Sequence, residues 1–375
     1  MDFDLTEEQT LLKATLAQYL AQRAGFAERT AASRSEPGYR TTMWQDLAQT
    51  LGLLGATLPE SAGGLGGGAV EQMIIMEELG RALLLEPVPE TVFHGAWLLE
   101  RCGAHDLLAG VVDGSVRLAV ALGEPEMRHD YADIATRAAP AGSGWALTGS
   151  KAVVMAAPWA THLIVAARTS GQPGDADGLS LFSLDANSDG LTLHPYPTID
   201  GRRAADVLLD GAIATLIGAE GGALALIEEM RDRAIAGQAA EAAGLLATLV
   251  KDTVEYTKQR QQFGQAISGF QVLQHRMVDM HMQVEMVRSA AVLATLKLDG
   301  DPVERALAAS AAKVTLANAC RFVGQNAVQL HGGMGMTDEL AIGHYFKRAT
   351  VLESEFGSAD WHLARHAALA VKRAA

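Results

Sequence analysis

Cysteine is scarce in this chain of 375 residues: Cys102 and Cys320 are the two, and they form no C-x-x-C pair. Two isolated thiols argue against a disulfide framework or a structural zinc site and predict buried thiols in a reducing compartment. No apolar run in the sequence reaches the roughly 18 residues of a membrane-spanning helix. The first residues, "MDFDLTEEQ", are acidic and lack the basic and apolar regions of a signal peptide. These absences predict a cytoplasmic protein with no metal site and no membrane partner.

Positive charge and aromatic side chains are also in short supply. The formal net charge is -14 at pH 7, and aromatic residues make up 5% of the chain, whereas 49% of it is apolar. An acidic surface repels a phosphate backbone, so the sequence argues against a non-specific nucleic-acid binder. An anionic small molecule remains possible, because a local group of arginines and backbone N–H groups can hold one. The composition predicts a helix-rich globular protein, and this length suits two or three packed domains.

The residue pattern changes twice along the chain, which predicts three domains. Residues 1–115 carry apolar side chains at helical spacing, with Thr6 as a candidate N-cap. Residues 116–218 are short β-rich runs without alternating helices, so we expect an antiparallel barrel or sandwich rather than a Rossmann sheet. Residues 219–375 return to long helices with short loops, as in a four-helix bundle. The expected fold class is therefore α+β, mainly α, with the long bundle helices at 224–262, 270–298, 302–331 and 337–372.

The stretch "RQQFGQAISGFQVLQHRMVDM", Arg260 to Met280, ends one predicted helix, turns through two glycines and starts the next. A helix that begins at Phe270-Gln271 presents free backbone N–H groups and the positive end of its dipole. Arg260 and Gln271 could therefore bracket a phosphate or an adenine. An ordinary helical hairpin with a surface arginine explains the same residues.

A second stretch, "QLHGGMGMTDE", Gln329 to Glu339, interrupts the predicted helices. Gly332 and Gly333 allow another backbone or a ligand to approach closely. A plain glycine cap at the end of a helix is the alternative. Taken alone, either stretch leaves both explanations open.

Together, in this order and separation, the two stretches resemble the acyl-CoA dehydrogenase family. The family pattern R-x-x-F-G followed by F-Q matches Arg260, Phe263, Gly264, Phe270 and Gln271. The family pattern Q-x-x-G-G-x-G matches Gln329, Gly332, Gly333 and Gly335. The resemblance extends over essentially the whole chain, including the N-terminal "LTEEQ" and the loop "LPESAGGLG".

This resemblance implies an N-terminal helical domain, a middle β-barrel and a C-terminal four-helix bundle, with FAD as the cofactor. The residues that it implies for FAD binding are Arg260, Phe263 and Gln271 at the pyrophosphate and adenosine and, from another subunit, Gln329, Gly332 and Gly333.

Family members use a glutamate to remove an α-proton from an acyl-CoA thioester, while the β-hydride passes to the flavin. In most members this glutamate stands directly before Gly-Thr, at a fixed distance after the Q-x-x-G-G motif. Here that place is held by Phe356, followed by Gly357 and Ser358. The resemblance therefore predicts that the usual catalytic base is missing.

Three nearby carboxylates are alternatives. Glu355 is one residue away, which turns its side chain by about 100° on a helix or about 180° on a strand, away from the pocket that Phe356 faces. Glu353 is better explained as a solvated or salt-bridged surface acid. Some members carry the base on the first bundle helix, near Ala234 here, and Asp232 lies roughly 200° around that helix. We therefore assign no catalytic residue and keep Glu355 and Asp232 as alternatives.

The β-rich segment departs from the family as well. The family stretch T-E-P-x-x-G-S-D corresponds to "GEPEMRHD", residues 123–130, which lacks the Thr and the Gly-Ser. The family's W-I-T becomes Val153-Val154-Met155, so a hydroxyl that would donate to the flavin is replaced by a thioether. The loss of this donor weakens the stabilisation of reduced flavin. The flavin-reducing half of the site is thus degraded, while both nucleotide-clamping motifs are intact.

This division is similar to that in heteromeric members of the family, in which a catalytic subunit pairs with a non-catalytic one. The nearest pattern is that of the small subunits of pimeloyl-CoA dehydrogenases, with counterparts of "RQQFG", "GFQVLQHRMVDM", "AVQLHGG", "GHYFKR" and "FGSADWHLAR". The resemblance implies an acyl-CoA substrate, either pimeloyl-like or with a steroid side chain. It also implies a homologous large subunit in a heterotetramer, and an electron-transfer flavoprotein as acceptor. A complete homo-oligomeric dehydrogenase with a relocated base and a non-enzymatic acyl-CoA-binding scaffold are the alternatives.

Two further groups of residues are expected to be structural. His362 and His366 are predicted to be polar side chains on one helix face, because Arg365 between them would oppose a metal ion. The methionines of the second bundle helix are predicted to be packing residues on that helix and not a binding site: Met277, Met280, Met282 and Met286.

Overall fold

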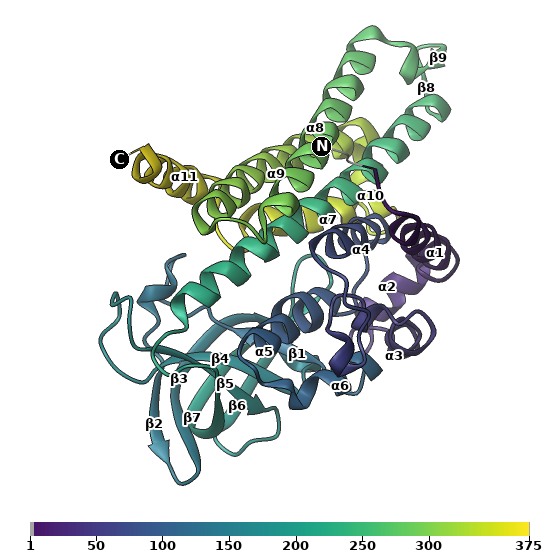
Figure 1. Cartoon of the computed structure of the whole chain (residues 1–375). Helices are drawn as coiled ribbons and strands as arrows, with labels where there is room; N and C mark the ends of the chain where they lie inside the picture. The colour runs from purple at the N-terminus through teal and green to yellow at the C-terminus, as the bar shows by residue number, and fades with distance from the viewer. Residues whose placement is uncertain (1–3, 375) are drawn as a thin grey trace. The chain divides into compact units, whose positions relative to one another are not determined.

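A computed structural model describes residues 4–374, which fall into two compact units (Figure 1). The first unit comprises the residues up to Arg29, Ala69–Leu84 and the segment from Asp232 onward. The second comprises Thr30–Gly68 and Leu85–Arg231. The first unit is helical, and the second combines short helices with the long strands.

The helices of the first unit begin where the sequence offers caps. The Thr6 hydroxyl accepts from the Gln9 N–H, and the Gln9 side chain accepts from the Thr6 N–H, so the predicted N-cap is confirmed. Asp301, ahead of Pro302, caps a later helix by accepting from the N–H groups of Val303 and Glu304. The helices of this unit are α1 (Glu7–Arg23), α4 (Ala69–Ala82), most of α7 (Leu224–Gln259), α8 (Gln271–Lys297), α9 (Pro302–His331), α10 (Ala341–Ser354) and α11 (Ala359–Ala374).

Helices α4 and α7 meet through glycine. A Cβ added at Gly80 would overlap the carbonyl oxygen of Glu241, and one added at Gly244 would overlap the carbonyl oxygen of Glu77. Because glycine has no side chain, the two backbones can approach this closely. The contact fixes the N-terminal helix α4 against the longest helix of the unit.

The last predicted helix is wrong in one respect. The sequence pattern predicts one helix over 337–372, whereas the structure has α10 and α11 with a break at Phe356 and Gly357. Both residues have positive φ, 61° and 119°, which a helix does not permit. The break lies at the position where the family carries its base.

The second unit is built on a seven-stranded sheet. Five strands pair in a closed ring, β2–β3–β7–β5–β4 and back to β2, which confirms the predicted barrel. Most pairings are antiparallel, but β4 pairs in parallel with β1 and β2, so the expectation of a purely antiparallel sheet is wrong. The strands are β1 (Leu118–Ala121), β2 (Arg137–Ala141), β3 (Gly144–Met155), β4 (His162–Arg168), β5 (Leu179–Asp185), β6 (Leu191–Pro197) and β7 (Arg203–Ile217).

The strands of the sheet differ in how far their residues are buried. Strands β4 and β5 are buried along almost their whole length, whereas β7 alternates between buried and exposed residues. The barrel core is mostly aliphatic, and the aromatic Phe182 is fully buried in it together with Leu147. The short helices of this unit are most of α2 (Phe26–Arg34), α3 (Thr41–Gln45), α5 (Trp97–Arg101) and α6 (Leu108–Asp113).

Candidate functional site

The first motif forms a tight hairpin at the end of α7 (Figure 1). Strands β8 (Gln261–Gln262) and β9 (Gln265–Ala266) are joined by Phe263 and Gly264, with φ of 54° and 79°. Positive φ at both central residues is the signature of a type I′ turn, which glycine adopts easily and phenylalanine does not. Phe263 is 90% exposed, and its ring meets only the edge of Phe270 at 6.1 Å among the ring pairs of residues 4–374. The strained turn therefore presents an aromatic ring to the outside of the unit.

The start of α8 lies directly behind this hairpin and fits an anionic group. Phe270 occupies the N-cap and offers no side-chain acceptor. Within the part of the chain that the structure describes, the N–H groups of Gln271 and Val272 have no hydrogen-bond partner, and Arg260 makes no side-chain hydrogen bond or ion pair. Open N–H groups, a helix dipole and a nearby guanidinium together suit a phosphate. The residues present thus fit the pyrophosphate of a dinucleotide.

The second motif closes α9. The helix ends at His331, and Gly332 follows with a φ of 59°. Gln329, Gly332 and Gly333 are exposed, and a Cβ added at either glycine would meet nothing within 4 Å. The Tyr256 ring stacks on His331 at 4.2 Å, which brings this motif beside the last turn of α7, one turn before the hairpin. The glycine pair therefore leaves open space beside the backbone, in which a bound group would not meet side-chain atoms.

The position at which the motifs predict a missing base lies in a tight turn at Phe356 and Gly357. Phe356 is half-buried, and its carbonyl oxygen contacts His362 Nε2 at 3.0 Å. The other ring nitrogen of His362 contacts the Ser310 hydroxyl at 3.2 Å. A Cβ at Gly357 would come within 2.7 Å of His362 Nε2, so this imidazole fills the space beneath the turn. The prediction of His362 as a polar face residue is wrong, because it is fully buried.

Glu355 belongs to a buried charged cluster. Its carboxylate accepts from Gln238 Nε2 at 2.9 Å and from Arg348 at 3.4 Å. Arg348 in turn binds both oxygens of Glu241, at 2.6 and 2.8 Å. Lys313, also buried, donates to the carbonyl oxygen of Glu355 and to the Gln238 side chain. A carboxylate held in this way supports the turn and is poorly placed to accept a substrate proton.

The other two alternative carboxylates are also paired. Glu353 contacts Arg321 at 2.8 Å, as predicted for a salt-bridged surface acid. Asp232 is buried and receives two hydrogen bonds from Arg365, at 2.6 and 3.1 Å, with Arg305 at 3.9 Å. Each of the three candidates for a relocated base is thus engaged with an arginine, a feature that sequence spacing alone does not reveal.

Lys313 gives a pH-dependent prediction. Burial lowers its pKa from 10.5 to about 8, against the opposing attraction of Glu355. Between these two values the unfolded chain binds more protons than the folded one, so this lysine makes the free energy of unfolding rise with pH through that window. We expect urea titrations at a series of pH values to show that the free energy of unfolding rises more steeply with pH for the wild type than for Lys313→Met. Parallel curves for the two proteins would contradict the assignment.

In the second unit, Glu124 of the "GEPEMRHD" stretch fixes its own loop. It accepts from Lys151 Nζ at 2.7 Å, from the Thr136 hydroxyl at 2.5 Å and from the N–H groups of Ala135 and Thr136. Burial raises the pKa of Glu124, but the Lys151 charge and these hydrogen bonds outweigh it and lower the pKa overall. The retained Glu124 therefore holds the loop rather than remaining available to a substrate.

The strand that carries the family's W-I-T has an irregular backbone. Lys151 and Val154 pair with Val207 and Ala205, so β3 contains one extra residue here, a β-bulge. Val153 has a φ of 52°, which is strained for a β-branched residue, and its side chain is 58% exposed. Its N–H donates to Asp206 Oδ1, which also accepts from the Tyr196 hydroxyl. The bulge and this hydrogen bond present an apolar side chain at the surface of the unit.

Two negative findings limit the chemistry. Between residues 4 and 374, no three His, Cys, Asp or Glu side chains are grouped as a metal ion would require. None of the helices in that range is both long enough and apolar enough to span a membrane.

Comparison with known proteins identifies the family. Three family models match in chain order: acyl-CoA dehydrogenase N-terminal domain at residues 6–107, middle domain at 119–210 and C-terminal domain at 222–369. The chain belongs to the acyl-CoA dehydrogenase family, as its motifs predict, and FAD is the cofactor of that family. The order agrees with the three predicted domains, whose exact boundaries stay predictions.

Individual relatives cover nearly the whole chain. Acyl-CoA dehydrogenase IpdE2 of Mycolicibacterium smegmatis is 29% identical over 92% of this chain and 93% of its own. A solved variant of the Tcur3481-Tcur3483 steroid ACAD has a TM-score of 0.88 at 33% identity and covers 98% of this chain and 99% of that one. The ChsE4-ChsE5 complex of Mycobacterium tuberculosis has a TM-score of 0.87 at 26% identity, over 97% of each chain.

Proposed function

We propose that this chain is the base-lacking subunit of a heteromeric, FAD-dependent acyl-CoA dehydrogenase. The observation that carries the proposal is the turn at Phe356: the family position of the base holds an aromatic ring, and Glu355, Glu353 and Asp232 are each paired with an arginine. An arginine partner occupies acceptor sites of a carboxylate and fixes its orientation, which leaves it less available as a general base. A relocated base is therefore the less favoured alternative.

In this proposal the chain contributes nucleotide binding. Arg260 and the open N–H groups at the start of α8 hold the FAD pyrophosphate, and Phe263 and Gln271 contact the adenosine region. Gln329, Gly332 and Gly333 offer the second contact, to FAD shared with another subunit. FAD, when bound, supplies the acceptor for the hydride removed from the acyl group.

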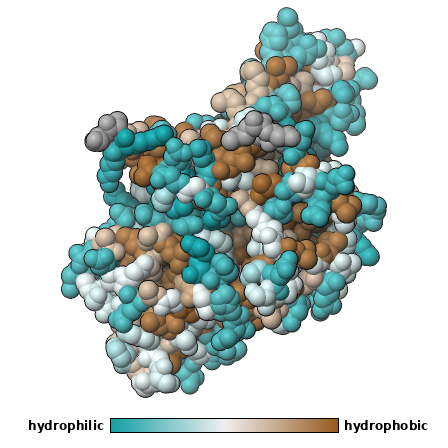
Figure 2. All heavy atoms as spheres, in the orientation of Figure 1, coloured by the Kyte–Doolittle hydropathy of each residue, from teal (hydrophilic) through white to brown (hydrophobic). Residues whose placement is uncertain are grey.

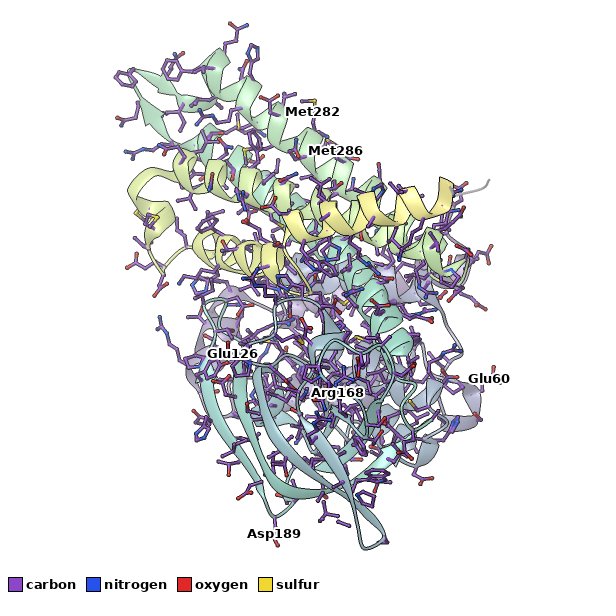
Figure 3. All side chains as sticks on the ribbon, turned by 90° about the vertical axis from the view of Figure 1, so that its left-hand side faces the viewer. Glu60, Glu126, Arg168, Asp189, Met282 and Met286 are labelled. Carbon is purple, nitrogen blue, oxygen red and sulfur yellow. The ribbon has the colours of Figure 1, made fainter. Side chains whose placement is uncertain are left out.

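One face of α8 supports the proposal of a partner. Val278, Met282, Met286 and Leu293 are about half exposed and recur at helical spacing. Met282 and Met286 lie one turn apart on the outside of α8 (Figure 3), so their predicted packing within this chain is wrong, whereas Met280 is buried as expected. Apolar residues also occur among polar ones on the arm formed by α7, the hairpin and α8 (Figure 2). An apolar helix face of this kind is suited to another subunit.

The names of the relatives favour a large acyl group. One solved relative is described as the Tcur3481-Tcur3483 steroid ACAD, and another as the ChsE4-ChsE5 complex. We therefore propose a CoA thioester of a steroid-derived acid as the substrate class, with pimeloyl-CoA as the second candidate. The partner is a homologous chain that carries the glutamate.

The test is to purify the chain alone and together with each homologous glutamate-bearing chain encoded beside it. We expect at least a 100-fold slower acyl-CoA oxidation from the chain alone than from the complex, because a positioned base contributes about 10²–10⁴-fold. In the complex, Arg260→Met should reduce the flavin bound per chain. Arg288→Met removes an exposed arginine of α8 that pairs with Glu285, and it should leave flavin content unchanged.

The alternatives give different results in the same experiment. If the chain alone turns over acyl-CoA and Glu355→Gln or Asp232→Asn lowers that rate 100-fold or more, the base is relocated. If no assembly contains flavin, the chain is a scaffold. Either result would overturn the proposal.

A further inference from the structure

The first unit contains a cavity that is separate from both nucleotide motifs and from the turn at Phe356. Residues of helices α1, α4, α7 and α10 line it, and its volume is about 320 Å³. Alanines line it from all four helices: Ala17 and Ala21 on α1, Ala82 on α4, Ala247 on α7 and Ala341 on α10. Because Ala17 and Ala21 are four residues apart, they lie on one face of α1. The hollow therefore exists because the helices meet through methyl groups instead of larger side chains.

The charges around the cavity are unlike those of the chain as a whole. Arg29, Arg81 and Lys251 line it together with one acid, Glu78, and Arg81 is also paired at 2.8 Å with Glu77, which lies outside the lining. Glu78 is buried and pairs with Arg81 at 3.3 Å, and burial raises the pKa of its carboxyl group. Arg29 donates to the carbonyl oxygen of Leu83. These two arginines are already engaged with protein groups.

Lys251 differs from both arginines. It is exposed at the cavity and makes no side-chain hydrogen bond or ion pair in the described part of the chain. Leu20 and Leu83, which are buried, and Phe26, which is half-buried, add apolar surface to the same lining. Asp252 interacts electrostatically with Lys251, but an ammonium group without an ion pair beside an apolar hollow is still complementary to an amphipathic anion.

The volume sets the size of the ligand. At about 30 Å³ for each water-sized group, 320 Å³ holds roughly ten non-hydrogen atoms. An unbranched carboxylic acid of eight carbons has this number of atoms. We propose that the cavity binds a medium-chain monocarboxylate, with its carboxylate at Lys251 and its alkyl chain among the alanines of α1, α4 and α7. This site is independent of the proposed subunit function.

Isothermal titration of the full chain with octanoate tests the proposal, with octylamine as the probe of opposite charge. We expect saturable octanoate binding with one site per chain and no saturable binding of octylamine. Lys251→Met should weaken octanoate binding at least five-fold. The matched control is Lys258→Met on the same helix, whose lysine pairs with Glu255 instead, and it should leave the affinity unchanged.

A cavity-filling change gives an independent test. Ala247→Leu and, in a separate protein, Ala21→Leu place a larger side chain in the hollow, and each should abolish octanoate binding while circular dichroism shows a folded chain. Two separate variants are made so that the test can still be carried out if one of them does not fold. The proposal is overturned if octanoate shows no saturable binding to the wild type. It is equally overturned if Lys251→Met and the folded leucine variants bind octanoate as the wild type does.

Discussion

Replacing Arg348 with methionine is expected to lower the free energy of unfolding by about 3–5 kcal/mol. Arg348 is 3% exposed and binds both carboxylate oxygens of Glu241, which is 5% exposed. It also contacts Glu355, the residue before the turn at Phe356. The substitution leaves a buried carboxylate without its cation, which costs far more than the loss of an exposed pair. Urea denaturation followed by circular dichroism measures the change.

The control is Arg321→Met on the neighbouring helix α9. Arg321 pairs with Glu353, but its side chain is 62% exposed, so we expect a loss below about 1 kcal/mol. The double variant Arg348→Met with Glu241→Met should recover part of the loss, because an apolar pair can replace a buried ion pair. Equal losses from Arg348→Met and Arg321→Met would show that burial does not determine the contribution of Arg348.

Replacing Gly244 with alanine is expected to lower the free energy of unfolding by about 3 kcal/mol, at the upper end of the usual cost of overpacking. The added methyl group would overlap the carbonyl oxygen of Glu77 on α4, and this oxygen belongs to a backbone that cannot rotate away. Alanine favours an isolated helix over glycine by about 1 kcal/mol, so a net loss can arise only from the contact between helices. Thermal and urea unfolding both measure this loss of stability.

Gly333→Ala is the matched comparison. A Cβ there meets nothing within 4 Å, so the stability should stay within about 0.5 kcal/mol of the wild type. Because Gly333 belongs to the proposed FAD contact, the flavin content of the complex should fall instead. A stabilised Gly244→Ala protein would disprove the close contact between α4 and α7.

Helix periodicity predicted the bundle well, but it could not predict its interruption. The expected helices at 224–262, 270–298 and 302–331 correspond to α7, α8 and α9 within a few residues. The expected helix at 337–372 is two helices. Its apolar pattern continues through the break, which depends on the left-handed conformation of Phe356 and on a hydrogen bond from Lys313, 42 residues earlier in the chain. A local pattern contains no information about such a distant donor.

The candidate site, too, could be predicted from the sequence only in part. Motif spacing located the hairpin at Arg260, the glycine pair and the turn at Phe356, where the usual base is predicted to be missing. It did not predict that Phe263 adopts positive φ, because aromatic residues rarely do so. It also could not identify the partners of Glu355 and Asp232, because Gln238 and Arg365 are 117 and 133 residues away in sequence. Position along the chain indicates which carboxylates are candidates for the base, and only the fold shows which of them already have hydrogen-bond or ion-pair partners.

The apolar face of α8 has a consequence for the supply of this protein in the cell. If the proposed partner covers this face, a copy made in excess of that partner would leave Val278, Met282, Met286 and Leu293 uncovered. Such surfaces promote self-association and attract chaperones and proteases, so the surplus would be removed. The lifetime of this chain would then depend on the abundance of its partner. The amount of the chain that persists would be set by the ratio in which the two chains are synthesised.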